Sequence, residues 1–258
     1  MTALSHSPAT GAAPLSRMVL CHARMETRLL LRNGEQLLLA IAIPLLLLVG
    51  GAEAGGLIDL GSGRRIDVLA PGVLALAVMS TAFTSLAIST AFERRYGVLK
   101  RLGASPLPRS GLLLGKVVSL LVVEAAQLSV ICVVGLALGW RPTGGIPAAA
   151  GVGLLVVLGT MAFAALGLLV AGTLRAEATL AAANLAYVLL LGAGAVVVPL
   201  SKYPEWMQPA VAALPSGALA EGLREVTTGA ALGWTRLFVL ACWSIVAAAL
   251  TVRTFRWE

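Results

Sequence analysis

Long apolar segments separated by short polar ones dominate the pattern of this chain. Ala, Leu and Gly are the main residues of these segments, and polar and apolar residues do not alternate with a period of two, which favours helices over a membrane barrel. A helix needs about 20 apolar residues to cross a hydrocarbon core about 30 Å thick. We therefore predict an all-helical membrane protein with six transmembrane helices, at about residues 37–52, 68–92, 112–138, 146–174, 178–200 and 237–252.

The composition excludes a soluble domain. The chain has 258 residues, of which 59% are hydrophobic and only 12% are charged. A soluble chain usually has about a quarter charged residues, so this one lacks the charge to cover its own surface. We expect residues 1–14, which are small and polar, to be disordered and residues 15–258 to form one transmembrane domain.

The distribution of positive charge predicts the orientation in the membrane. The segments on one side of the six predicted spans hold twelve Lys and Arg residues, whereas those on the other side hold six. Cytoplasmic loops carry an excess of Lys and Arg. We therefore expect a multi-pass protein of the inner or plasma membrane with both termini in the cytoplasm.

The segment before the first span is typical of a basic amphipathic helix. Over residues 15–36, Arg17, Arg24 and Arg28 fall on one strip of a helical wheel, and apolar residues occupy the other half. Such a helix lies on the lipid of the inner leaflet, where one interpretation is a passive anchor. Glu26 falls on the apolar side, so it either meets a cation of the neighbouring bundle or shows that this helix packs against protein.

The basic segment after the second span is longer than a simple connection requires. Val98, Leu99 and Leu102 line one side of a predicted short helix, which Gly103 and Pro106 would end. A helix of this kind, parallel to the membrane, would fit a groove on a cytoplasmic partner. The alternative is a basic loop that only obeys the positive-inside rule.

The segment before the last span, residues 201–235, has apolar stretches too short to cross the membrane. One interpretation is a pair of half-inserted helices, broken near Pro215, that cover the outer end of a cavity. The other is an ordinary structured external loop.

Four charged or amide side chains lie inside the predicted spans, where charged groups are costly. Lys116 is near one end of its span and is expected to extend toward the inner headgroups. Glu124, Gln127 and Asn184 lie deeper. They are candidates for a polar spot on a cavity wall that attracts a cationic amphiphile, or alternatively for hydrogen bonds between helices.

Enzyme chemistry and metal binding find no support in the sequence. The three cysteines show no C-x-x-C spacing, and the two histidines are isolated. Residues 111–116 end in Gly-Lys but lack the spacing of a P-loop. We expect no catalytic residue, no metal and no cofactor in this chain, and no nucleic-acid partner.

Three of these segments resemble the permease subunits of type-2 ABC exporters, in particular the daunorubicin-resistance type of bacterial drug efflux system. Residues 93–102, followed by Ser-Pro at 105–106 and Gly-Lys at 115–116, are similar to the coupling helix region of that family, although Lys100 departs from its pattern. The basic amphipathic helix is similar to the family's connecting helix. The resemblance implies that the ATPase docks on Glu93, Arg94, Gly97, Val98, Leu99, Arg101, Leu102, Ser105 and Pro106, and that Pro204, Trp206, Pro215 and Arg224 belong to external re-entrant helices.

The resemblance also implies a division of labour between subunits. A separate ABC ATPase subunit would bind ATP and Mg, and a second permease, identical or a paralogue, would complete the pathway. The expected activity is export of hydrophobic or amphiphilic cargo, drug-like or lipid-like, by alternating access. A polysaccharide or envelope-polymer exporter, or a non-transporting membrane subunit, is the alternative; few aromatic residues lie inside the spans, which weakly favours hydrophobic cargo.

Overall fold

The computed structural model describes residues 13–53 and 64–255, and within these ranges it consists of helices joined by short connections, without strands. The prediction of disorder over residues 1–14 falls almost entirely outside the described residues. The helices are α1 (Leu15–Arg32), α2 (Gly34–Glu53), α3 (Arg65–Met79), α4 (Leu86–Arg95), α5 (Val98–Gly103), α6 (Arg109–Ala137), α7 (Gly145–Thr173), α8 (Ala176–Ala193), α9 (Gln208–Ala212), α10 (Pro215–Thr227) and α11 (Trp234–Thr254).

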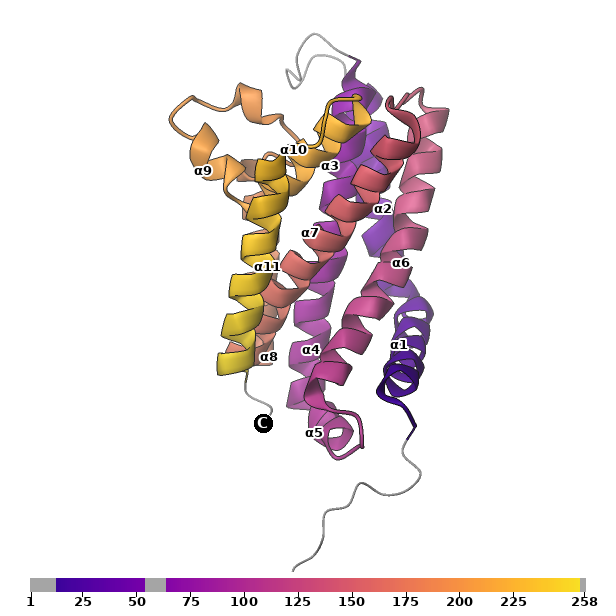
Figure 1. Cartoon of the computed structure of the whole chain (residues 1–258), viewed down its shortest axis with the longest axis vertical. Helices are drawn as coiled ribbons and strands as arrows, with labels where there is room; N and C mark the ends of the chain where they lie inside the picture. Colours follow the sequence, from indigo (N-terminus) through magenta and orange to yellow (C-terminus); the bar gives the residue numbers. More distant parts are fainter. Residues whose placement is uncertain (1–12, 54–63, 256–258) are drawn as a thin grey trace, which may run out of the picture.

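The apolar helices run side by side along the long axis of the molecule (Figure 1). A π-helical turn, η1 (Ser80–Ser85), joins α3 and α4 into one continuous helix. Five helices are long and apolar enough to cross a membrane: Arg65–Arg95, Ser110–Ala137, Gly145–Thr173, Ala176–Ala193 and Trp234–Thr254. In α2 the corresponding apolar stretch is the shorter Ala40–Glu53, so the sixth span stays a prediction.

The predicted fifth span, residues 178–200, extends too far. Helix α8 ends at Ala193, and the chain then folds inward without helical structure until the 3₁₀ turn η2 (Leu200–Lys202). Ala195 and Val196 are buried there, and Ala195 has a positive φ of 55°. Because these residues are apolar, hydropathy alone does not distinguish this buried connection from the end of a membrane helix.

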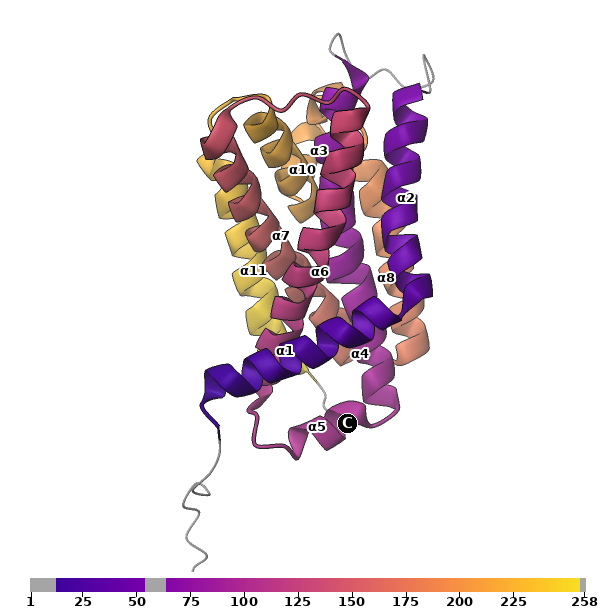
Figure 2. The same ribbon diagram turned by 90° about the vertical axis from the view of Figure 1, so that its right-hand side faces the viewer.

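The connections gather at two ends of the bundle. Helix α1 lies across the lower part of the long helices, and α5 lies below it (Figure 2). At the opposite end lie α9, α10 and the start of α11 (Figure 1). The basic segments that charge counting placed on one side of the membrane, including residues 15–32 and 94–101, thus share one end of the molecule.

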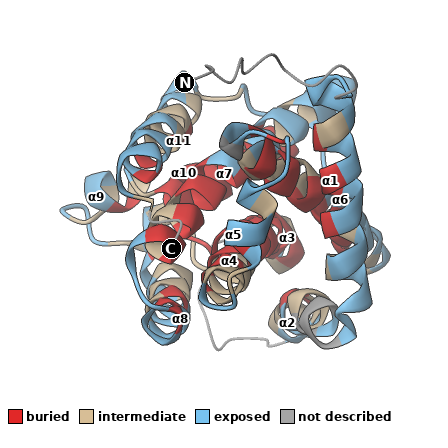
Figure 3. Ribbon diagram, turned by 90° about the horizontal axis from the view of Figure 1, so that it is seen from below, coloured by how far each residue is buried: buried red, intermediate tan, exposed pale blue. Residues whose placement is uncertain are grey.

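Helices α3, α7 and α10 form the core. Viewed along the bundle, the buried residues concentrate on these three helices, whereas α2, α8 and α11 expose their outer sides (Figure 3). Helix α10 is short but almost completely buried, because it packs against α3, α7 and α11. Its first residue is Pro215, which fits the start of a helix since proline has no N–H to leave unpaired there.

Candidate functional site

Gly97 produces the turn that separates α5 from α4. Its φ of 71° lies in the left-handed region, where a residue with a side chain is strained. The N–H groups of Tyr96 and Gly97 donate to the carbonyls of Phe92 and Arg94, which ends α4. The short helix predicted from the sequence is confirmed, and it ends at Gly103 as expected.

Burial divides the side chains of α5 into an inner and an outer side. Leu99 is only 3% exposed, whereas Val98 is 38% exposed and Arg101 lies on the surface. Leu102 is half-buried and packs on a cluster that contains Val19 of α1. Leu99 therefore packs inside the bundle, and its contact with an ATPase stays a prediction. We use the name α5 surface for six of the exposed residues at this end: Tyr96, Val98, Lys100, Arg101, Ser105 and Pro106.

Glu93 and Arg94, which were expected to dock the ATPase, make contacts within the chain. Arg94 donates a hydrogen bond to the carbonyl of Leu174, at the connection between α7 and α8. Glu93 is half-buried and pairs with Lys116. These two residues fix the end of α4 to the bundle and thereby fix the start of α5, which follows it directly in the chain.

Lys116 is the centre of a buried ion cluster. Its side chain is 3% exposed, and its Nζ atom lies 3.1 Å from Glu26 Oε1 and 2.8 Å from Glu93 Oε2. The expected extension of Lys116 to the headgroups is wrong, because the ammonium group turns inward. The prediction that Glu26 meets a cation of the bundle is confirmed. We call Glu26, Glu93 and Lys116 the Lys116 cluster.

His22 adjoins this cluster from α1. Its Nε2 atom lies 3.5 Å from Glu26 Oε1, and its side chain is 5% exposed. Burial lowers the pKa of His22 below its usual value, against the opposing effect of Glu26 and in the same direction as the charge of Lys116. The neutral imidazole is therefore favoured in the folded protein.

Glu124 and Gln127 are both buried in contacts between helices. Thr160 of α7 donates a hydrogen bond of 2.5 Å to Glu124 Oε2. The Gln127 amide accepts a hydrogen bond of 2.8 Å from Thr81 in η1 and donates one of 2.6 Å to the carbonyl of Ala40 in α2. Of the two interpretations, the geometry favours hydrogen bonding between helices.

Asn184 does not join them. It is exposed on α8, whereas Glu124 is completely buried between α6 and α7. The predicted polar spot of Glu124, Gln127 and Asn184 is therefore wrong. A helix of α8's composition gives little indication of which of its faces turns inward, because apolar residues surround it on all sides.

In the segment between α8 and α11, Arg224 makes hydrogen bonds that join separate parts of the chain. It is 7% exposed and donates to Glu221 at 2.6 Å. It also donates to the carbonyls of Ala195 and Val196 at 2.7 and 2.6 Å, and to that of Val68 at 3.3 Å. The guanidinium group thus fastens the buried connection after α8 to α3 and α10.

The other predicted residues of that segment are dispersed. Trp206 and Pro204 are exposed on the connection before α9, and Trp206 is 79% exposed. The chain breaks between α9 and α10 next to the buried Pro215, as predicted. Insertion of this pair into the membrane stays a prediction.

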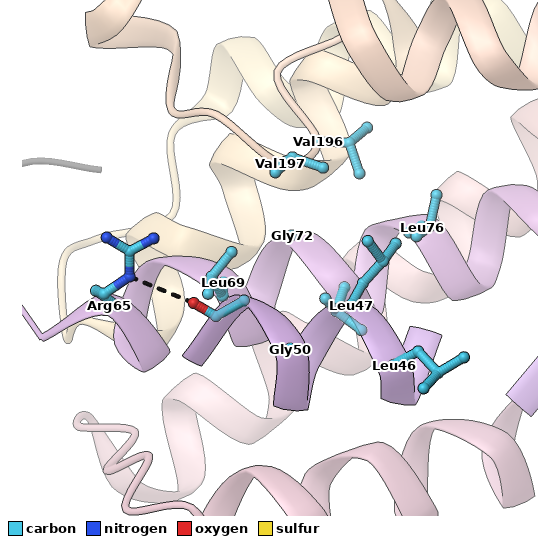
Figure 4. Close-up of a pocket in the computed structure, with 11 residues that line it drawn as sticks. Leu46, Leu47, Gly50, Arg65, Leu69, Gly72, Leu76, Val196 and Val197 are labelled. Atoms are coloured by element: carbon cyan, nitrogen blue, oxygen red, sulfur yellow. Dashed lines mark hydrogen bonds between the residues drawn. The ribbon is translucent and has the colours of Figure 1, made fainter. Parts of the chain in front are cut away.

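An apolar cavity of about 260 Å³ lies between α2, α3 and the connection after α8 (Figure 4). Arg65, at one end of it, donates a 3.3 Å hydrogen bond to the carbonyl of Gly51. Gly72 faces Val196 so closely that a Cβ atom there would overlap the carbonyl oxygen of Val196. The cavity is lined by Leu46, Leu47, Gly50, Gly51, Arg65, Leu69, Gly72, Val73, Leu76, Val196 and Val197.

Comparison with known proteins identifies the family. Residues 13–227 match the family described as ABC-2 type transporter. The chain belongs to the ABC-2 type transporter family. It is 31% identical over 236 residues to the daunorubicin resistance ABC transporter permease protein DrrB1 of Streptomyces coeruleorubidus, covering 86% of this chain and 80% of that protein.

Two further relatives of this ABC-2 protein are also permeases by name. The probable doxorubicin resistance ABC transporter permease protein DrrC of Mycobacterium tuberculosis is 28% identical over 158 residues, which are 61% of this chain and 57% of the relative. The putative transport permease YvfS of Bacillus subtilis is 24% identical over 183 residues, or 68% and 71%. The resemblance to drug-resistance permeases is thereby confirmed.

Several residues of this ABC-2 protein were missed by reasoning from the sequence. Thr81 and Thr160, the hydrogen-bond donors to the buried polar residues, are short side chains inside apolar helices and give no signal of their own. Arg65 and Gly72, which line the cavity, also give no signal in the sequence, because only the folded chain brings the lining residues together. Glu26, by contrast, was detectable as a carboxylate on the wrong side of an amphipathic helix.

Proposed function

We propose that this permease is the membrane subunit of an ATP-driven exporter that moves hydrophobic or amphiphilic cargo, drug-like or lipid-like, out of the cytoplasm. The single observation that carries the proposal is the α5 surface. It projects at the basic end of an ABC-2 bundle and exposes an apolar residue, Val98, among cations such as Arg101. A surface of this kind suits an acidic-rimmed groove on a separate ATPase subunit.

The proposed topology follows from the two ends of the bundle. Six helices cross the plasma or inner membrane, with α2 as the first span. The end that holds α1 and α5 faces the cytoplasm, because cytoplasmic segments concentrate Lys and Arg. Both termini lie on that side. Two ATPases, which bind ATP and Mg, and a second permease, identical or a paralogue, complete the exporter.

The proposed coupling is mechanical. Closure of the ATPases pushes the α5 surface, and Arg94 and Glu93 connect this helix to α7, α8 and α6. The bundle then moves between an inward-open and an outward-open state, with cargo biasing the two states only through different contacts in each.

The residues that line the cavity beside α3 indicate the chemical class of the cargo. Gln127 is hydrogen-bonded to η1 and α2, and Glu124 is completely buried, so neither side chain lines the cavity beside α3. The cavity beside α3 is lined by aliphatic residues apart from Arg65. Apolar walls with few polar groups select hydrophobic or amphiphilic molecules. The names of the relatives, which include daunorubicin and doxorubicin resistance, point to the same class.

The test uses the permease expressed together with a candidate ABC ATPase subunit. Val98→Asp combined with Arg101→Glu should lower both the co-purifying ATPase and doxorubicin efflux at least tenfold, because it places negative charge and a polar group on the α5 surface. Arg175→Glu repeats the charge reversal of Arg101→Glu at the same end but outside α5, and should retain both.

The outcomes separate the rival functions. Retention of ATPase and efflux by the double variant would refute the docking role of α5. A wild-type permease that binds no ATPase would be a non-transporting subunit. A wild-type complex that hydrolyses ATP without exporting doxorubicin would refute the proposed cargo and return attention to polymer export.

A further inference from the structure

The Lys116 cluster joins three helices that are far apart in the sequence. Glu26 comes from α1, Glu93 from the end of α4 and Lys116 from the first third of α6. Lys116 Nζ is within 2.9 Å of Glu93 Oε1 and within 3.1 Å of Glu26 Oε1, so one ammonium group serves two carboxylates. Neither resemblance to the family nor charge counting assigns a role to this contact.

The location of the cluster relates α1 to the α5 surface. Helix α5 is the segment between α4 and α6, and the cluster ties together these two helices just inside the bundle. Helix α1 lies across the bundle above α5 (Figure 2) and continues, through Asn33, into α2. The cluster is thus the polar link between the helices that hold α5 and the helix that leads to the first span.

Other contacts of α1 with α6 include the packing of Val19 on Leu112 and the contact of His22 with Gly115 and with the backbone of Leu112, to which it is hydrogen-bonded. The apolar contacts tolerate sliding, because they have no fixed direction. A buried ion pair does not, since displacing one partner leaves a charge buried without compensation. The cluster therefore fixes the position of α1 along α6.

We propose that Lys116 is a positioning residue that fastens α1 to α4 and α6, so that a displacement of α5 moves the three helices as one body and reaches α2 through α1. The inference rests on the proposed function, because it names the contact by which an ATP-driven movement at α5 spreads to the first span. Glu26 is the residue of the Lys116 cluster that lies on α1.

Glu26→Gln is the variant that separates fastening from folding. It removes the charge of the α1 arm with little change of shape and leaves the pair of Lys116 with Glu93 in place. Glu177→Gln is the matched control, because Glu177 forms an ion pair with Arg95 at the same end but has a 65% exposed side chain and no contact with the cluster. Lys116→Arg, which keeps the charge, should retain at least half of wild-type transport.

The first measurement compares ATP hydrolysis with ATP-dependent doxorubicin uptake in inside-out vesicles that contain the permease and its ATPase. In Glu26→Gln, uptake per ATP hydrolysed should fall at least fivefold while hydrolysis stays within twofold of wild type. A merely structural role would lower both rates together with the amount of complex. Unchanged uptake per ATP in Glu26→Gln would overturn the inference.

A covalent link provides the rescue. A Cβ atom at Gly115 would overlap the ring of His22, so these two positions are direct neighbours and are chosen for a cysteine pair. In a chain whose native Cys21, Cys132 and Cys242 are replaced by serine, His22→Cys with Gly115→Cys should restore the uptake of Glu26→Gln to at least half under oxidation. Complete cross-linking without restored uptake would overturn the inference.

Hydrogen exchange in the purified permease tests whether Glu26 holds α1 in place, without any measurement of transport. Amide exchange over residues 15–32 should be at least tenfold faster in Glu26→Gln than in Glu177→Gln. Equal exchange in the two variants would overturn the inference even if the wild-type complex moved no doxorubicin, a result that by itself would count against the proposed function.

Discussion

Replacing Arg224 by methionine should release the connection after α8 from α3 and α10. Methionine keeps the length and apolar stem of arginine but has no donor. The carbonyls of Ala195 and Val196 would lose donors at 2.7 and 2.6 Å, and Glu221 would lose its cation. The carboxylate of Glu221 would keep the N–H of Leu200, at 3.0 Å.

The size of the effect follows from the burial of the group. Arg224 is 7% exposed, and breaking a buried ion pair by removing one partner costs about 3–5 kcal/mol. Arg236→Met is the control, since Arg236 pairs with Glu225 at 3.1 Å with side chains that are 17% and 28% exposed. A pair this accessible is worth about 1 kcal/mol. At about 2–4 °C per kcal/mol, the two variants should differ in unfolding temperature by roughly 4–16 °C.

Thermal unfolding in detergent, followed by tryptophan fluorescence, measures this difference. A double-mutant cycle with Glu221→Gln should in addition give a coupling energy of at least about 1 kcal/mol, because the two side chains contact each other directly. Equal unfolding temperatures for Arg224→Met and Arg236→Met would refute the reasoning, since the carbonyl contacts would then contribute nothing.

Three further predictions can be checked by the same unfolding assay. Thr160→Val should cost about 1–3 kcal/mol, because it leaves the buried carboxyl of Glu124 without its donor; an unchanged unfolding temperature would contradict it. Gly72→Ala should cost about 1–3 kcal/mol by overlap with the facing carbonyl, whereas Gly50→Ala, which meets no atom within 4 Å, should not destabilise. Since burial holds the pKa of His22 below its usual 6.5, the unfolded chain binds the proton more readily; stability should fall as pH drops below about 6.5, and His22→Leu should reduce this dependence.

The apolar pattern identified most helices because length and hydrophobicity determine them locally. Residues 112–138 and 146–174 correspond closely to α6 and α7, and the short helix after Gly97 was found from its terminating glycine. The error at residues 194–200 has a physical cause. This connection is apolar because it is buried inside protein, held by Arg224, and a window of hydropathy does not distinguish burial in protein from burial in lipid.

The polar residues show where sequence reasoning ends. Glu26 was recognisable because a carboxylate on an apolar face requires a partner, but choosing Lys116 as that partner requires the packing of α1 on α6. Asn184 and Gln127 look equivalent in the sequence, yet one is exposed and the other is buried. The difference depends on how each helix is rotated about its axis, which long apolar helices do not encode in a hydrophobic stripe.

The placement of these charges restricts how the permease can choose its cargo. In the part of the chain that the structure describes, Lys116 and Arg224 are each paired with carboxylates of the same chain, and Glu124 accepts a hydrogen bond from Thr160 with one of its two carboxyl oxygens. Recruiting Lys116 or Arg224 to hold a ligand would break a buried ion pair, which costs about 3–5 kcal/mol. We therefore expect the shape of apolar walls, such as the one that Leu69 and Val73 present to the cavity, to discriminate between cargo molecules. Selectivity of this kind is broad, because one methylene group changes the binding free energy by only about 1 kcal/mol.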